Sequence, residues 1–253
     1  MDILNRWLRE AGLERRPRQL DLSGADLRNA NLRNADMPRI ILTNANLRNA
    51  ILSQADLGKC NLDSADLGSA TLNEANLAAC SMVRTNLTNA SLIRADLREA
   101  NLSEANLNGT KLGGADLRRA NLSRAKVERV DLNGADCSLA IFSQTDFRWS
   151  NLSGANLSKT RCAGANFYHT SLEKVDFSEA ELSEARFMAA DLTDANLSDL
   201  DLTRTSLDGA ILKNCNLSGA KINPGQLGRV QSLEGTLMPD GNHYDPVMHR
   251  HLL

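Results

Sequence analysis

The sequence has few aromatic residues and no long apolar segment. Of its 253 residues only 4% are aromatic, although 42% are hydrophobic. Compact domains of this length usually fill their cores with aromatic rings, so this core must be narrow and built from smaller aliphatic side chains. No run of about 18 apolar residues occurs, and the N-terminus lacks the apolar part of a secretory signal. We therefore expect a cytoplasmic protein that makes no contact with a membrane.

The sequence also lacks a large excess of either charge and any reactive motif. The formal net charge is −2, which argues against a strongly basic protein that binds nucleic acid directly. No nucleophile–base pair, glycine-rich phosphate loop or Cys-x-x-Cys motif appears. We expect neither enzymatic activity nor a cofactor.

A repeat of five residues dominates the chain. Every fifth position from Leu22 to Ile222 holds Leu or a residue that replaces it, which makes 41 consecutive pentapeptides without an insertion. We call this position the central slot. Two residues earlier stands the small slot, most often Ala, and between them lies the Asx position, usually Asp or Asn, as in Ala25-Asp26-Leu27. The two residues that follow the central slot are the first and second corner positions.

A period of five fits neither an α-helix nor a flat strand. The small and central slots are two residues apart, so they share an inward face, whereas both corner positions point outward and require a bend. The chain must therefore coil around a narrow core, with coils stacked about 4.8 Å apart through parallel backbone hydrogen bonds.

The Asx position predicts four pentapeptides in each coil. In every fourth repeat it is always Asp or Asn, whereas the intervening columns also hold Ile, Thr, Ser and Arg. Because Asp and Asn hydrogen-bond nearby backbone at tight corners, we expect two faces to use a different turn from the other two. Phe147, Phe167 and Phe187 should then stack inside the coil. The invariant column consists of Asp36, Asp56, Asn76, Asp96, Asp116, Asp136, Asn156, Asp176, Asn196 and Asn216.

This motif resembles the pentapeptide repeat family, whose members form a right-handed quadrilateral β-helix. The resemblance covers residues 20–222. It implies an all-β solenoid, a right-handed quadrilateral parallel β-helix of about ten 20-residue coils and about 48 Å in length. Because exposed solenoid edges recruit other chains, we expect a short capping helix at each end.

Four segments are predicted. Residues 1–19 form an N-terminal capping helix, 20–222 the β-helix, 223–241 a C-terminal capping helix and turn, and 242–253 a flexible tail. The second helix begins at Asn223-Pro224 and carries Leu227, Val230 and Leu233. Met238-Pro239-Asp240-Gly241 forms the turn, similar to the Pro-Asp-Gly ending common in cyanobacterial members of the family.

The cysteine and carboxylate columns allow more than one interpretation. Cys60 and Cys80 are one coil apart, near enough for a disulfide, but their parallel side chains give poor geometry, so free buried thiols are expected. The Asp/Asn columns could collect a cation, and hydrogen bonding at turns explains them equally well. Three of the four His lie in the C-terminal tail, so we expect no metal site. All five cysteines occupy inward slots: Cys60, Cys80, Cys137, Cys162 and Cys215.

One surface combines aromatic rings with Arg and Met. These outward residues lie beside the Phe147–Phe187 face, and such clusters are enriched at partner interfaces. The alternative is that the rings merely stabilise adjacent coils by stacking. We predict a partner-binding site formed by Arg129, Arg148, Trp149, Tyr168, His169 and Met188.

Acidic residues concentrate between residues 173 and 208. We take them as a secondary acidic surface. Its members are Asp176, Glu179, Glu181, Glu184, Asp191, Asp194, Asp199 and Asp201.

The function expected is that of a monomeric, regulatory, non-catalytic scaffold for an unidentified protein partner. The resemblance implies it, because one cyanobacterial member regulates heterocyst differentiation by binding a regulatory protein. The alternative is a DNA mimic that binds type II topoisomerase (gyrase), as quinolone-resistance members do. Duplex DNA carries a charge about every 1.7 Å, so a mimic should be acidic throughout. Basic residues interrupt any such stripe here: Arg28, Arg33, Arg39, Arg48, Arg118, Arg119, Arg124 and Arg129.

Overall fold

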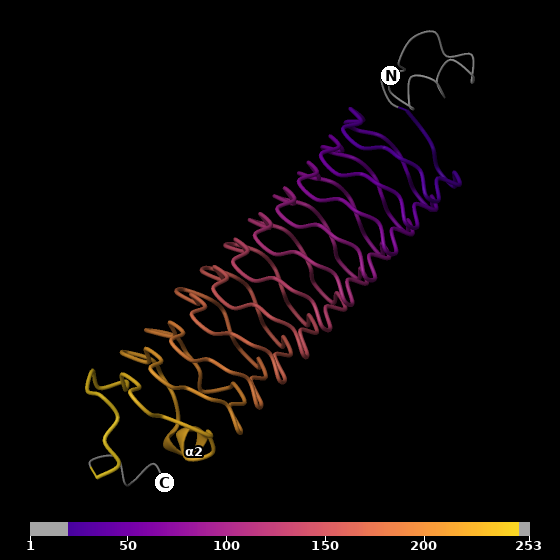
Figure 1. The fold of residues 1–253 in the computed structure, drawn as a ribbon. Helices are drawn as coiled ribbons and strands as arrows, with labels where there is room; N and C mark the ends of the chain where they lie inside the picture. The colour runs from indigo at the N-terminus through magenta and orange to yellow at the C-terminus, as the bar shows by residue number, and fades with distance from the viewer. Residues whose placement is uncertain (1–19, 248–253) are drawn as a thin grey trace, which may run out of the picture.

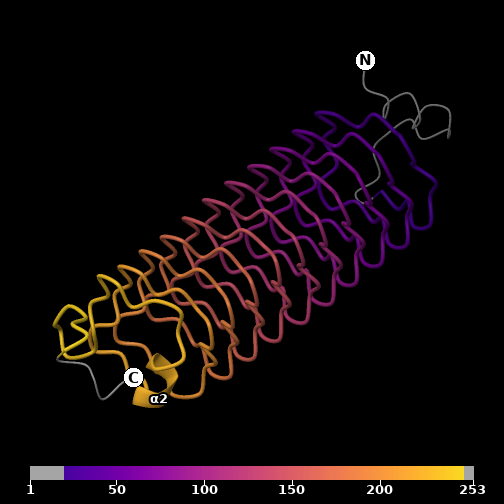
Figure 2. The ribbon, with the colours of Figure 1, turned by 60° about the horizontal axis from the view of Figure 1, so that its bottom comes forward.

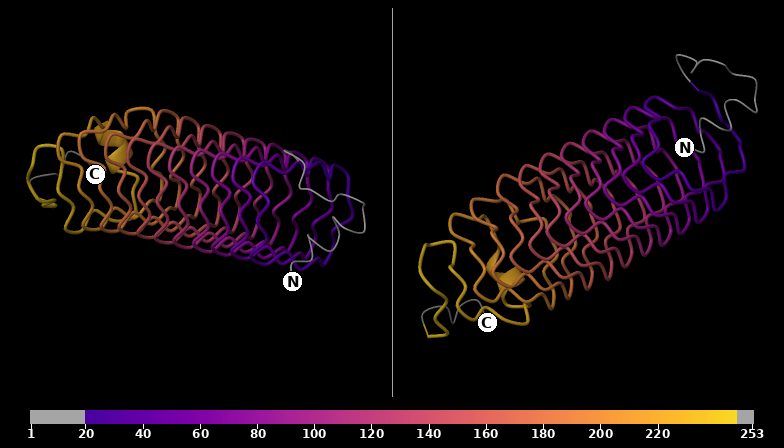
Figure 3. Two further views of the ribbon diagram at one scale, coloured as in Figure 1. Left: turned by 90° about the horizontal axis from the view of Figure 1, so that it is seen from above. Right: turned by 45° about the horizontal axis from the view of Figure 1, so that its top comes forward.

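The computed structural model describes residues 20–247, which form a solenoid of stacked coils (Figure 1). Parallel bridges join residues 20 apart, beginning with Asp21 and Ile41, so four pentapeptides make one coil as predicted. Figures 2 and 3 show the coils in register along the whole rod. Among the described residues the bridges are isolated, without extended strands, and the only helix is α2, Pro224–Leu227. The predicted N-terminal capping helix lies outside the described residues.

The coils are held together by a repeated set of backbone hydrogen bonds. In the pentapeptide 67–71, Leu67 and Ser69 donate their N–H groups to the next coil, and Thr71 donates to the preceding coil. Ala70 donates to the carbonyl of Leu67 at 2.9 Å and closes the turn. The corresponding bond from the small slot to the central slot is 3.1 Å or shorter in most other repeats. Only the first corner position, here Gly68, has no backbone acceptor.

The Asx side chain accepts this remaining N–H group. The Oδ1 of Asp66 lies 2.9 Å from the nitrogen of Gly68, and the Oδ1 of Asn156 lies 3.0 Å from that of Ser158. Asp and Asn share this acceptor, which explains why they interchange. The structure thus supports hydrogen bonding at turns as the reason for the Asp/Asn columns.

A neighbouring coil can replace a missing Asx residue. Ser81 occupies the Asx position before Val83, and the N–H of Val83 donates instead to Oδ1 of Asp63, 2.9 Å away in the preceding coil. Asn73 serves Ile93 in the same way at 3.0 Å. The first corner N–H group of a repeat can therefore be satisfied by either of two routes.

The expectation of two turn types is wrong. Every second corner position from 24 to 219 has a positive φ, from 52° at His169 to 70° at Gly109, with the single exception of Arg204. A positive φ at this position is typical of a type II turn. At most of these corners the second corner N–H donates to the first corner carbonyl of the next coil, which favours one backbone orientation. The columns differ in how the first corner N–H is satisfied, and the backbone conformation stays uniform.

The core consists of the central and small slots. Phe147 and Phe167 stack with ring centroids 5.1 Å apart, and Phe167 and Phe187 with centroids 4.9 Å apart, which confirms the predicted ladder. Inward hydroxyls donate to carbonyls of the preceding coil, as Thr170 does to Phe147 at 2.8 Å. Within residues 20–247 no buried side-chain nitrogen or oxygen lacks a hydrogen-bond partner.

One rung of the ladder is missing between Glu181 and Asp201. Leu200 stands beside it in a small slot, whereas the residues above and below in that column are Ala180 and Ala220. Leu200 is buried, so its larger side chain must be accommodated between the coils. The irregular corner at Arg204 follows directly after it.

Helix α2 begins after Asn223 as predicted but is shorter than expected. The amide of Gln226 donates to the carbonyls of Leu202 and Thr205, both at 2.8 Å, and replaces the backbone donors that the helix removes. The prediction that Leu233 belongs to this helix is wrong. The chain resumes coiling after α2 with an offset of one residue, Ile211 bridging to Ser232, and Leu233 is buried as a central-slot residue.

The last coil folds back on itself. Gly241 donates to the carbonyl of Met238 at 2.9 Å, which confirms the predicted turn. Leu237 then forms an antiparallel bridge with His243, and this pairing occupies part of the terminal edge. The helical segment of residues 20–247 is too short to cross a membrane.

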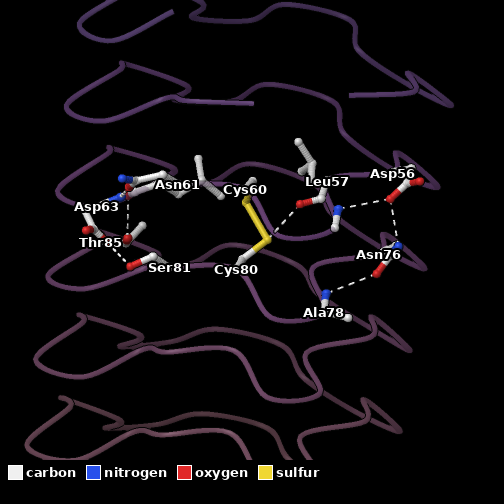
Figure 4. Close-up of a disulfide and its surroundings, with 12 residues drawn as sticks. Asp56, Leu57, Cys60, Asn61, Asp63, Asn76, Ala78, Cys80, Ser81 and Thr85 are labelled. Atoms are coloured by element: carbon white, nitrogen blue, oxygen red, sulfur yellow. Dashed lines mark hydrogen bonds between the residues drawn. A yellow bond between two sulfur atoms is a disulfide. The ribbon is translucent and has the colours of Figure 1, made fainter. Parts of the chain in front are cut away.

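A disulfide joins Cys60 and Cys80, where free thiols were expected (Figure 4). Equivalent positions in adjacent coils have Cα atoms 4.6 Å apart, inside the range that a disulfide spans. Cys137, Cys162 and Cys215 are free and buried, as predicted. Burial raises the pKa of the Cys162 and Cys215 thiols to about 12, so these thiols stay protonated and unreactive.

The disulfide predicts a defined thiol count. Unfolded without a reductant, the protein should react with Ellman's reagent at three thiols, and after reduction at all five. Because the bond closes a loop of one coil, its reduction should lower the free energy of unfolding by about 3 kcal/mol. Five reactive thiols before reduction would show that the disulfide does not form.

The Asx acceptor predicts a difference between two substitutions of Asp176. Its Oδ1 accepts the N–H of Ser178 at 2.9 Å and the amide of Asn196 at 3.0 Å. Asp176→Ala leaves the Ser178 N–H without its acceptor and should cost about 1 kcal/mol in urea unfolding. Asp176→Asn keeps the acceptor and should stay close to wild type. Equal losses in both variants would contradict this role.

The same carboxylates predict weaker stability in acid. Hydrogen bonds from the Arg28 guanidinium, then from its N–H, lower the pKa of Asp26 from 3.8 to about 2. The Thr203 hydroxyl and N–H lower the pKa of Asp201. Stability from a lowered pKa is present above the unfolded value and is lost as pH falls through the folded value. The free energy of unfolding should therefore decline from about pH 4 to about pH 2.

This decline should be smaller in Asp26→Asn, because Asn cannot take up the proton. Urea unfolding at a series of pH values measures it. A stability that stays constant between pH 4 and pH 2 would contradict the account.

Candidate partner-binding surface

Three predicted site residues form one cluster of rings. Trp149 and His169 occupy the second corner position in consecutive coils and stack with centroids 4.3 Å apart and planes 7° apart. Tyr168 meets both rings edge-on, 5.5 Å from Trp149 and 4.3 Å from His169. Trp149 remains 50% exposed and Met188, in the coil beyond Tyr168, 40% exposed. The structure therefore brings Trp149, Tyr168 and His169 together.

The backbone ladder positions these rings. Equivalent corners are one coil apart, and Trp149 and His169 both have the positive φ that the corner requires, 62° and 52°. On the inner side of the same pentapeptides, Phe147 and Phe167 stack at nearly the same spacing. The same coil spacing thus allows one aromatic stack in the core and a second one on the surface.

Arg148 is held within the protein. Its guanidinium contacts the carboxylate of Asp146 at 2.8 Å and also that of Glu128. The hydrogen bond to Asp146 raises the pKa of Arg148, with Glu128 adding to the effect. Two carboxylates therefore offset its charge, which leaves Arg148 less suited to pair with a partner than the sequence suggested.

Two other arginines at this surface are unpaired. Within residues 20–247, neither Arg129 nor Arg186 makes an ion pair or a side-chain hydrogen bond, and Arg186 is exposed. Arg186 occupies the Asx position two residues before Met188, and the prediction from sequence did not include it. The available signal was its departure from the Asp and Asn that fill most of its column. We call Trp149, Tyr168, His169, Met188 and these two arginines the aromatic face.

The predicted acidic surface is not a single patch. Consecutive residues of a solenoid visit all four sides, so the acidic residues encircle the rod. Glu179 pairs with Lys159 and Glu181 with Arg161, each at 3.4 Å. Others serve as corner acceptors, as Asp191 does for Thr193 at 3.0 Å. Much of this negative charge is therefore used inside the protein.

The chemistry available at the aromatic face is stacking and charge pairing. Planar rings can stack further groups, and unpaired guanidinium groups can pair with carboxylates. In the part of the chain that the structure describes, no group of three His, Cys, Asp or Glu side chains could hold a metal ion.

Comparisons with known proteins agree on the repeat. A family model described as pentapeptide repeats matches the chain in eight copies, which together span residues 18–42, 40–78, 80–119, 120–158, 160–199 and 185–223. The search of curated proteins found no match.

Two solved structures illustrate the similarity. The chain is similar to HetL, a pentapeptide repeat protein involved in heterocyst differentiation regulation from the cyanobacterium Nostoc sp. strain PCC 7120. The identity is 31%, the match covers 96% of this chain and 100% of HetL, and the TM-score is 0.53. It is also similar to QnrB1, a plasmid-mediated fluoroquinolone resistance protein, at 19% identity, 81% and 92% coverage and a TM-score of 0.47.

Proposed function

The chain belongs to the pentapeptide repeat family, and we propose that it is a regulatory scaffold that binds a protein partner through the aromatic face. In this proposal the protein is a monomeric, cytoplasmic, right-handed β-helical rod of about ten coils. It acts by presenting a rigid surface and catalyses no reaction. The involvement of HetL in heterocyst differentiation regulation supports a regulatory role.

The observation that carries the proposal is the exposure of apolar and aromatic groups beside unpaired arginines. Trp149 and Met188 are among the few exposed large hydrophobic residues of the described chain. Aromatic, Met and Arg side chains are the types enriched in protein interfaces. Stacking between coils accounts for the Trp149–His169 contact, but it leaves the exposed Met188 and the unpaired Arg186 without a role.

A DNA mimic is less consistent with the charge arrangement. A phosphate-like stripe needs a column of unpaired carboxylates. In the middle of the Asp/Asn column, Asp96 pairs with Arg98 and Asp116 with Arg118, each at 2.6 Å. These ion pairs interrupt the negative stripe, so binding of gyrase is kept as an outcome of the test below.

The test is a quantitative pull-down from a source lysate with a double variant, Trp149→Ala/Tyr168→Ala. Both positions point outward, so the fold should persist, and a partner captured by wild type should be lost. Leu139→Ala is the matched control. Leu139 is 44% exposed at a second corner position ten residues from Trp149, hence on the opposite corner of the same coil.

A partner retained by the double variant but lost by Leu139→Ala would place the site elsewhere. Gyrase subunits captured equally by wild type and both variants would instead support the DNA mimic.

A further inference from the structure

The stack of rings on the aromatic face stops at His169. The next second corner positions in the same column are Ala189 and then Gly209. A Cβ atom added at Gly209 would meet only the backbone nitrogen of Ala189, 3.9 Å away. At Gly109, in contrast, it would clash with Oδ1 of Asn89, because a longer side chain covers that corner. The column therefore has an open place beyond His169.

One face of the His169 ring borders this open place. Its other face stacks on Trp149, and Tyr168 contacts it edge-on. Within residues 20–247 no further ring and no side-chain hydrogen bond engages His169. Met188, which precedes Ala189 in the chain, is 40% exposed and adds apolar surface next to this corner. The open place therefore lies where the next ring of the stack would be, one coil beyond His169.

A positive charge belongs to the same pentapeptide as Ala189. Arg186 precedes Met188 by two residues, and in equivalent pentapeptides the residues at these two positions touch, as Asp146 and Arg148 do. Asp208, which follows Met188 in its column, is already paired with Arg229 at 2.9 Å. Arg186 therefore has no carboxylate to pair with among the described residues.

We propose that the partner inserts an aromatic side chain over Ala189, stacked on His169, and pairs a neighbouring carboxylate with Arg186. This inference rests on the proposed function and specifies the chemistry of the partner. A nucleobase could stack in the same place, but nucleic-acid binding relies on many Lys and Arg side chains that neutralise phosphates, whereas the aromatic face offers two unpaired arginines on a protein with a net charge of −2. The occupant is therefore a protein segment.

The experiment titrates the full chain with N-acetyl-phenylalanine, which carries both a ring and a carboxylate, and follows the His169 ring protons by NMR. Stacking should move these signals upfield. Ala189→Leu fills the open place and should weaken binding of the probe by about tenfold. Leucine is compatible with the backbone here, because Leu139 occupies an equivalent corner at a φ of 63°.

Ala79→Leu is the matched control, since it adds the same side chain at a corner with a φ of 55° in a different column. It should bind the probe as wild type does. Arg186→Gln should abolish the preference for N-acetyl-phenylalanine over its uncharged amide. N-acetyl-cyclohexylalanine, which has no planar ring, should produce no upfield shift.

Unchanged binding in Ala189→Leu, or tighter binding of adenosine monophosphate than of N-acetyl-phenylalanine, would overturn the inference. The two proposals fail separately. A partner lost from the Trp149→Ala/Tyr168→Ala variant but retained by Ala189→Leu would leave the aromatic face in place as the binding site and remove only the inserted ring.

Discussion

The regular coil depends on the backbone hydrogen bonds that run between coils and close each turn. They satisfy four of the five N–H groups of a typical repeat, and the first corner N–H is the donor that uses a side chain, where an Asx residue supplies the acceptor. From 24 to 219 every second corner position except Arg204 has a positive φ, even in the repeat of Ile51, which offers no such acceptor, and even with a side chain as bulky as Trp149. Uniform corners keep successive coils in register, and the outward residues consequently form straight columns.

These columns explain how a repetitive rod can recognise a specific partner. The backbone is nearly identical from coil to coil, so specificity must come from side chains at a few outward positions. Neighbouring side chains in one column are separated by the coil spacing, which suits the stacking of planar rings. Phe147 and Phe167 use this spacing in the core, and Trp149 and His169 use it on the surface. A column that stops, as this one does at Ala189, leaves a place that another molecule can fill.

The sequence was sufficient to predict those features that follow from the repeat lengths of five and twenty residues. The four-sided coil, the Phe ladder and the ring cluster all follow from counting residues in steps of five and twenty. Features that depend on individual contacts could not be predicted in this way. Column composition suggested two turn types, because it cannot distinguish a change of backbone conformation from a change in the acceptor of the first corner N–H. The pairing of Arg148 by Glu128 depends on side-chain positions in adjacent coils, and so does the lack of a partner for Arg186 among residues 20–247.

The central claim is that the partner contacts the rod where the ring column ends. The most direct measurement is photo-crosslinking from a photoreactive amino acid placed at Met188, with the same group at Leu139 as reference and with mass spectrometry of the products. The account predicts a crosslink from position 188 to a partner peptide in which an aromatic residue lies next to Asp or Glu. Crosslinks formed only from position 139, or to peptides without an aromatic residue, would contradict it.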